Sequence, residues 1–282
     1  MTAFTLVSDA IPESERNARV YDGEIIVFRQ IPAVRELVAT LAEHVTGHYG
    51  EDPTRVHTRW NTDAVHDEAQ TLRKLVAKDP GATESIRAAL EAVGVDPETT
   101  YDDGLEPRVQ PPKTAAEGDV LSPLGAHRDT WASNLMTQVN WWAPVWPITA
   151  QRTLAIFPAH FRRAVPNSSA DWDFAELLRR IKAGESTDDY PLLPLATEPP
   201  AWEDAVPVTI EPGDLMAFSG AQLHASVPNT TDRTRFSFEI RTVSEPDTAA
   251  GRGAPNVDGR APRTTYQWFR RLSDRVKLGR MA

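Results

Sequence analysis

Residues 211–238, EPGDLMAFSGAQLHASVPNTTDRTRFSF, contain two strand-like apolar runs with a polar turn between them. The runs are short, rich in aromatic and apolar residues, and bounded by Gly, Pro, Asn and Asp, as is typical of β-strands joined by turns. His224 follows the first run, and Arg235 opens the second run 11 residues later. Because a Pro-Asn turn signal separates them, the chain can return antiparallel and bring the arginine near the histidine.

Similar runs occur through much of the chain and indicate that most of the core is β-sheet. Each is short and is bounded by residues that favour turns, so the pattern predicts a mainly β sandwich or barrel with flanking helices. The runs are GEIIVFRQ (23–30), PRVQ (107–110), MTQVNWWAPVW (136–146), RTLAIFP (152–158) and VPVTI (206–210).

Helices are predicted where apolar residues recur every three or four positions. One helix begins at Pro32, and two amphipathic helices separated near Pro80 follow it. The predicted organisation is a single domain over residues 1–282, with a helical buttress at about 32–95, a helical insert at about 161–206 and a C-terminal helix at about 264–278.

The composition narrows the function classes. A net charge of -10 disfavours binding to nucleic acid, which needs clustered Lys and Arg to neutralise phosphates. No stretch approaches the ~18 apolar residues of a membrane span, and the N-terminus does not resemble a signal peptide. We therefore expect a cytoplasmic protein with a small-molecule substrate, no nucleic-acid partner and no membrane partner; the oligomeric state stays open.

Candidate metal ligands come from two segments of the sequence. The chain has no cysteine, so any metal must bind His, Asp or Glu. In LGAHRDTW, residues 124–131, His127 and Asp129 are two apart, which on a strand places both side chains on one face. With His224 they form a two-histidine, one-carboxylate set, which suits iron(II) and leaves positions open for a bidentate 2-oxo acid and dioxygen.

Arg235 is the candidate anchor for the distal carboxylate of such a 2-oxo acid. Its guanidinium can donate two parallel hydrogen bonds to a carboxylate, and Ser237, on the same strand face, can add a third.

Several of these residues together resemble the phytanoyl-CoA dioxygenase and ectoine hydroxylase family, over roughly residues 20–245. The resemblance implies a double-stranded β-helix, the jelly-roll barrel, with iron(II) on His127, Asp129 and His224. It also implies that Arg235, helped by Ser226, binds the C5 carboxylate of 2-oxoglutarate. Residues 148–161, ITAQRTLAIFPAHF, depart from the family pattern, so the resemblance extends to the cofactors and not to the substrate. The matching residues are His127-x-Asp129, Gly213-Asp214, Phe218, His224-x-Ser226, Pro228-Asn229 and Arg235.

Further site candidates follow from strand alternation. Asn140 and Gln138 alternate with apolar residues and are predicted to lie beside 2-oxoglutarate, although the polar side of this strand would face water in a simple sheet. The predicted substrate contacts are Trp131, Trp142, Arg108 and Arg241, where surface ion pairs are the alternative role for the arginines.

The predicted activity is that of an Fe(II)/2-oxoglutarate-dependent dioxygenase. It would hydroxylate an unactivated C–H of a small molecule and release succinate and CO2, with desaturation or ring closure as other outcomes. A cupin-type metal-dependent hydrolase or isomerase and a catalytically silent ligand-binding barrel are the alternatives. Arg235 with Ser237 argues against the first, and the intact metal set argues against the second.

Overall fold

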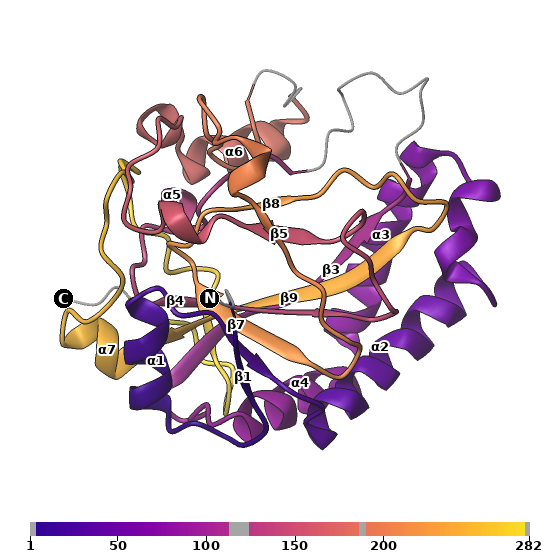
Figure 1. Cartoon of the computed structure of the whole chain (residues 1–282), viewed down its shortest axis with the longest axis horizontal. Coiled ribbons are helices and arrows are strands. Elements are labelled where there is room, and N and C mark those ends of the chain that lie inside the picture. The colour runs from indigo at the N-terminus through magenta and orange to yellow at the C-terminus, as the bar shows by residue number, and fades with distance from the viewer. Residues whose placement is uncertain (1–3, 113–123, 186–189, 280–282) are drawn as a thin grey trace.

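A computed structural model describes residues 4–112, 124–185 and 190–279, and they form two facing β-sheets with helices around them (Figure 1). Strand β1 pairs parallel with β2, and the other strand pairs are antiparallel. The large sheet contains, in spatial order, β1 (Thr5–Val7), β2 (Ile26–Phe28), β7 (Leu215–Ser219), β4 (Gln138–Pro144), β9 (Arg235–Ser244), β3 (Thr100–Gln110) and β10 (Arg270–Arg271). The small sheet contains β6 (Val206–Pro207), β5 (Leu154–Ile156) and β8 (His224–Ser226).

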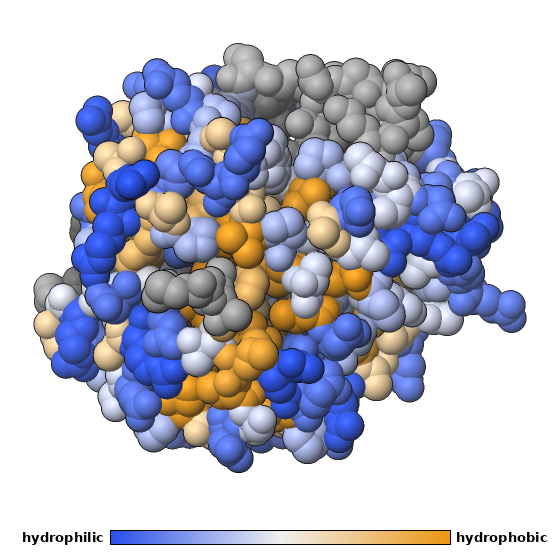
Figure 2. Space-filling model, in the orientation of Figure 1, coloured by the Kyte–Doolittle hydropathy of each residue, from blue (hydrophilic) through white to orange (hydrophobic). Residues whose placement is uncertain are grey.

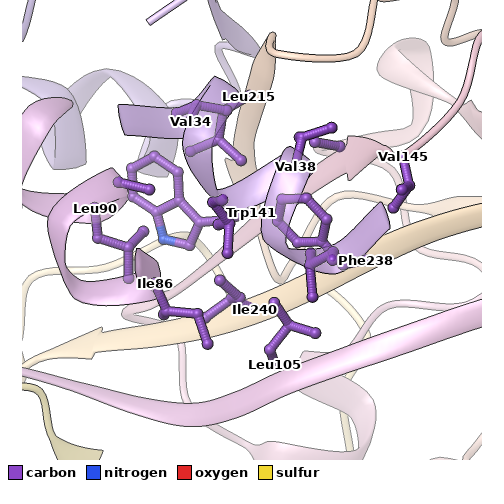
Figure 3. Packing of buried hydrophobic residues seen from close by; sticks show 14 of the residues in the cluster. Val34, Val38, Ile86, Leu90, Leu105, Trp141, Val145, Leu215, Phe238 and Ile240 are labelled. Atoms are coloured by element: carbon purple, nitrogen blue, oxygen red, sulfur yellow. The ribbon is translucent and has the colours of Figure 1, made fainter. Parts of the chain in front are cut away.

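The outer face of the large sheet is covered by helices that fall within the predicted buttress. These are α2 (Pro32–Tyr49), α3 (Thr62–Lys78) and α4 (Pro80–Ala92). Their apolar faces pack on alternate strand residues such as Trp141 and Phe238, both fully buried (Figure 3). Removing this much apolar surface from water is the main force that holds the helices on the sheet.

The inner face of the large sheet faces the small sheet and has an apolar part and a polar part. Along β7 and β2 it is apolar, where Trp142, Met216 and Phe218 pack against Ile156 of the small sheet. Along β9 it is polar, because the register places Arg241 opposite Asn140 and on the same face. The mainly β fold with flanking helices, predicted from the sequence, is confirmed.

Short helices connect the strands. The first, α1 (Glu13–Tyr21), was not predicted from the sequence. In the predicted insert, the α-helix is α6 (Phe174–Ala183), which begins at an Asp173 cap and ends at Gly184 in the left-handed conformation. The remaining α-helices in the described residues are α5 (Thr130–Ser133) and α7 (Glu245–Ala249).

The C-terminal helix predicted at residues 264–278 is wrong. Turns occupy this segment, and its strand β10 pairs with β3. Phe269 and Leu272 are buried, and the guanidinium of Arg271 donates to the Tyr101 hydroxyl on β3. The apolar spacing fits a helix equally well, but these contacts with the sheet outweigh intrinsic helix propensity.

The surface is polar over the helical side formed by α2 and α3, while hydrophobic residues gather toward the middle of the same view (Figure 2). Leu6 on the edge strand β1 is 58% exposed. Within the described ranges, no helix is both long and apolar enough to cross a bilayer.

Candidate metal centre

His127 and His224 are brought together by backbone pairing at the edge of the small sheet. The backbone N–H of each donates to the carbonyl of the other, at 2.9 and 3.0 Å, and their ring centroids are 4.1 Å apart. Each Nδ1 lies within 2.9 Å of a carbonyl two residues earlier, on Gly125 and Gln222. Because a carbonyl only accepts, each Nδ1 carries the proton and each Nε2 keeps its lone pair for a metal.

Asp129 also lies at this site, but its backbone conformation differs from the predicted one. It has helical dihedral angles, φ −63° and ψ −29°, at the start of α5, so the expected strand parity with His127 is wrong. The helical turn nevertheless brings Asp129 Oδ1 to 3.5 Å from His127 Nε2. The ligand atoms of Asp129 and the two histidines all lie within 4.8 Å of one another. Donors at right angles on one metal are about 3 Å apart, so the side chains would have to move closer together to coordinate one ion.

Burial and neighbouring groups shift the pKa values of His224 and Asp129 toward the protonation states that a metal needs. Burial lowers the pKa of His224 to about 4, with a further contribution from His127, so the ring is neutral at neutral pH. Burial alone would raise the pKa of Asp129, but the adjacent His127, with the nearby His224 and Arg241, holds it below its usual value. The site therefore offers a neutral imidazole on His224 and a carboxylate on Asp129.

Asn140 and Gln138, predicted beside 2-oxoglutarate, both contact the carboxylate of Asp129, the candidate metal ligand. Asn140 Nδ2 donates to Asp129 Oδ2 at 2.6 Å, and Gln138 Nε2 lies 3.3 Å from the same oxygen. Gln138 Nε2 also donates to Asn140 Oδ1 at 2.9 Å. These bonds occupy Oδ2 and leave Oδ1 toward the histidines, so the two amides orient the carboxylate.

We expect Asn140→Ala to weaken metal binding by about 10- to 100-fold, because the Asp129 carboxylate loses the donor that orients it. Titration of the apoprotein with Co(II) measures this. Asn17→Ala is the matched control, since Asn17 is also buried but donates to Asp247, outside the metal centre. Equal metal affinity in the Asn140 variant and the native protein would contradict the orienting role.

Arg235 is a buried cation whose guanidinium is largely unsatisfied. It is 5% exposed, and within the described residues its Nε and Nη1 have no hydrogen-bond partner; the same holds for Ser237 Oγ. Burial, with the nearby Arg108, lowers the pKa of Arg235 to about 10, so it remains charged at neutral pH. Leaving a buried cation and its donors unpaired is costly, which indicates a place for an anionic group. A carboxylate accepting from Arg235 and Ser237 fits these unused donors.

Comparison with known families gives the decisive match. Residues 21–237 match the family model described as phytanoyl-CoA dioxygenase (PhyH), well over half of the chain. This chain belongs to the phytanoyl-CoA dioxygenase family. The resemblance seen in the sequence is thereby confirmed, and membership identifies the chain as an oxygenase.

Solved structures similar to this family member have low sequence identity to it. EvdO2 of Micromonospora carbonacea var. aurantiaca, solved with 2-oxoglutarate, is 14% identical with a TM-score of 0.50, over 84% of this chain and 93% of EvdO2. The epimerase SnoN, solved with Fe3+, alpha-ketoglutarate and nogalamycin RO, is 16% identical with a TM-score of 0.42, over 90% of this chain and 96% of SnoN. The likeness to EvdO2 shows the shared fold. No curated protein matches the sequence.

In this phytanoyl-CoA dioxygenase family member, the two further predicted arginines are held in ion pairs on the inner face of the large sheet. Arg108 contacts Glu239 at 2.8 Å, and Arg241 contacts Asp103 at 2.5 Å. The side chains of Arg108 and Arg241 are 36% and 25% exposed, and those of Glu239 and Asp103 are 11% and 6% exposed, so both are partly buried ion pairs. A substrate contact by either arginine remains a prediction.

Ser226 and the two tryptophans lie in different surroundings. Ser226, at the end of β8, is half-buried and pairs with Leu154. Trp142 is 2% exposed and packs in the apolar barrel interior. Trp131 is fully buried, and its indole N–H donates to Asp258 at 2.7 Å. The ring and the polar atom of Trp131 are thus both engaged within the protein, and a substrate contact by Trp131 remains a prediction.

Glu239 is an interior residue that the sequence reasoning missed. In β9, Arg235, Ser237, Glu239 and Arg241 alternate with apolar residues that pack under the helices. The sequence did contain a signal for Glu239, namely the alternation of polar and apolar residues along this strand. When the apolar residues pack on one face of a sheet, the alternating polar residues share the other face. That face is the inner one, toward the metal centre.

Proposed function

We propose that this family member is an Fe(II)/2-oxoglutarate-dependent oxygenase that hydroxylates an unactivated C–H of a small molecule, with release of succinate and CO2. The observation that carries the proposal is the buried, unpaired guanidinium of Arg235 in the same barrel as the His127, Asp129 and His224 set. A metal hydrolase has no need of a second, deeply buried anion site, whereas a 2-oxo diacid does.

The residues have separate tasks in this proposal. His127, Asp129 and His224 would hold iron(II) and leave coordination positions for the 2-oxo acid and dioxygen. Iron, 2-oxoglutarate and dioxygen together supply an oxidant strong enough to attack an unactivated C–H. Arg235 and Ser237, helped by Ser226 as the family resemblance implies, would bind the C5 carboxylate and so fix the orientation of the co-substrate.

The apolar half of the barrel interior, where Trp142, Met216 and Phe218 are buried, excludes water from one side of the site. A dry wall protects a reactive oxidant from side reactions. Whether hydroxylation, desaturation or ring closure follows depends on where the substrate carbon is held.

Two measurements test the proposal. Anaerobic addition of 2-oxoglutarate to the Fe(II)-loaded protein should produce a visible metal-to-ligand charge-transfer band, which a metal hydrolase would lack. Succinate release is then screened over amino acids, nucleosides and acyl thioesters with Fe(II), 2-oxoglutarate and oxygen. Absence of both the band and any 2-oxoglutarate consumption would contradict the proposal.

The carboxylate at Asp129 also predicts the product class. A halide can join the metal only where a coordination position and a negative charge are vacant, and Asp129 supplies both itself. We therefore expect no halogenated product when turnover of an identified substrate is run in concentrated chloride or bromide. Mass spectrometry of the products checks this through halogen isotope patterns, and a substantial halogenated fraction would mean that Asp129 is not a ligand.

A further inference from the structure

A C-terminal segment, residues 253–265, runs along the segment that carries two of the metal ligands. We call it the strap. It lies beyond residues 21–237, the part of the chain that matches the family model. Its backbone and side chains bond along residues 128–136: Ala254 N to Met136 O at 2.9 Å, Thr265 N to Ser133 O at 2.9 Å, and Asn134 Nδ2 to Thr264 Oγ1 at 3.1 Å.

Asp258 is the buried acidic residue of the strap, with its side chain 5% exposed. Its Oδ2 accepts from Arg128 Nε at 3.1 Å and from the Val165 backbone N–H at 3.0 Å. Its Oδ1 accepts from Trp131 Nε1 at 2.7 Å. The carboxylate therefore holds one residue on each side of Asp129, namely Arg128 before it and Trp131 after it.

Arg128 links the two parts of the metal centre. It lies between His127 and Asp129 in the sequence and is 2% exposed. Its Nη1 donates to the carbonyl of Ala221, in the turn that leads from β7 to His224. Its Nη2 donates to the carbonyls of His160 and Arg163, each at 2.8 Å. One side chain thus joins the turn that carries two ligands to the turn that precedes the third.

The geometry of the turn that carries His127 and Asp129 depends on tertiary contacts. The helix α5 that follows Asp129 has only 4 residues, too few to be stable by its own hydrogen bonds. Within the described parts of the chain, Asp258 is the carboxylate paired with Arg128. Removing its charge would leave a buried guanidinium among carbonyl dipoles alone, and the turn could then relax to expose it.

We propose that Asp258 is a positioning residue for the metal centre: through Arg128 and Trp131 it fixes the turn that presents His127 and Asp129. The inference rests on the proposed metal-binding function. Groups that orient ligands in this way set metal affinity, because ligand atoms must be held to within tenths of an ångström.

The test compares Asp258→Asn with Asp247→Asn in the full chain. Asp247 is a similarly buried carboxylate, with its side chain 7% exposed, that accepts from Asn17, Tyr21 and Arg252 and contacts no residue of the metal-binding turn. Both variants should lose thermal stability. The apoproteins are titrated with Co(II), and the dissociation constant and visible d–d spectrum are recorded. We expect about 10- to 100-fold weaker binding and a changed spectrum for Asp258→Asn, and native values for Asp247→Asn.

Trp131→Phe provides a second variant if Asp258→Asn does not fold. It removes one donor to Asp258 and leaves the Arg128 ion pair, so we expect a loss of Co(II) affinity of about three- to tenfold. Native affinity and spectrum in the folded variants would overturn the positioning role and leave Asp258 a structural residue. Failure of the native protein itself to bind Co(II) or Fe(II) would instead overturn the proposed function and this inference with it.

Discussion

Replacement of Arg235 by alanine is expected to weaken 2-oxoglutarate binding by about 2–4 kcal/mol, or roughly 30- to 1000-fold, while metal affinity stays near the native value. The reason is that Arg235 has unpaired buried donors from which a carboxylate can accept, whereas in the described residues it makes no hydrogen bond or ion pair with His127, Asp129 or His224. Calorimetric titration of the Mn(II)-loaded protein with 2-oxoglutarate, under nitrogen, measures the change.

Thermal stability gives an independent measurement of the same prediction. In the native protein 2-oxoglutarate should raise the melting temperature, because a ligand that binds only the folded state stabilises it. The Arg235→Ala variant should show almost no rise. Without ligand it should be little less stable than the native protein, since the substitution removes a buried cation that has few partners to lose.

Two further variants separate the effect of the planar guanidinium from that of its charge, and both from the general effect of losing a buried arginine. Arg235→Lys keeps the charge but loses the planar fork. Its affinity for 2-oxoglutarate should therefore lie between that of the native protein and that of Arg235→Ala. Arg16→Leu removes another buried arginine, which lies over Trp141 on the outer side of the sheet. It should lower stability and leave 2-oxoglutarate affinity unchanged. Unchanged affinity in Arg235→Ala would reject the assigned role.

The sequence was sufficient to predict the elements that depend on local patterns. Strands β4, β7 and β9 and helices α2 to α4 have strong periodicity, and each appears where that periodicity places it. The set of His127, Asp129 and His224 was also predicted from spacing and resemblance, but the local reason was wrong for Asp129. A helical turn, and not strand alternation, presents this carboxylate. Different backbone paths can bring a pair of residues two apart to one site.

The remaining features depend on pairing between distant segments. Strand β3 has a register shift between Asp102 and Leu105, with Gly104 at φ 88°, a conformation that favours glycine. This bulge brings Asp103 to Arg241, so the ion pair could not be predicted without knowing the register of β3 on β9. Asp258 gave no signal either, since a single aspartate in a polar segment has no periodicity and its partners lie about 130 residues earlier.

Replacement of a metal ligand should have the largest effect of all. For His224→Ala and for Asp129→Ala we expect metal affinity to fall by more than about 100-fold, beyond the loss typical of residues that only orient a ligand. Metal-dependent 2-oxoglutarate consumption should fall to the background rate. Co(II) titration, metal content after dialysis and succinate release measure these effects, and His160→Ala is the control because this histidine pairs with Asp204 away from the set.

A double variant that combines His224→Ala with Asp129→Ala tests whether these residues and His127 act as one site. Residues that bind one metal act as a unit, so the double variant should be no worse in turnover than either single variant. Added Co(II) should raise the melting temperature of the native protein and of His160→Ala, and leave that of the ligand variants unchanged, because metal that binds the folded state stabilises it. Losses that multiply in the double variant, or a ligand variant that keeps native metal affinity, would show that the carboxylate and the histidine do not share an ion. His127, Asp129 and His224 would then be neighbours in the fold without forming a metal centre.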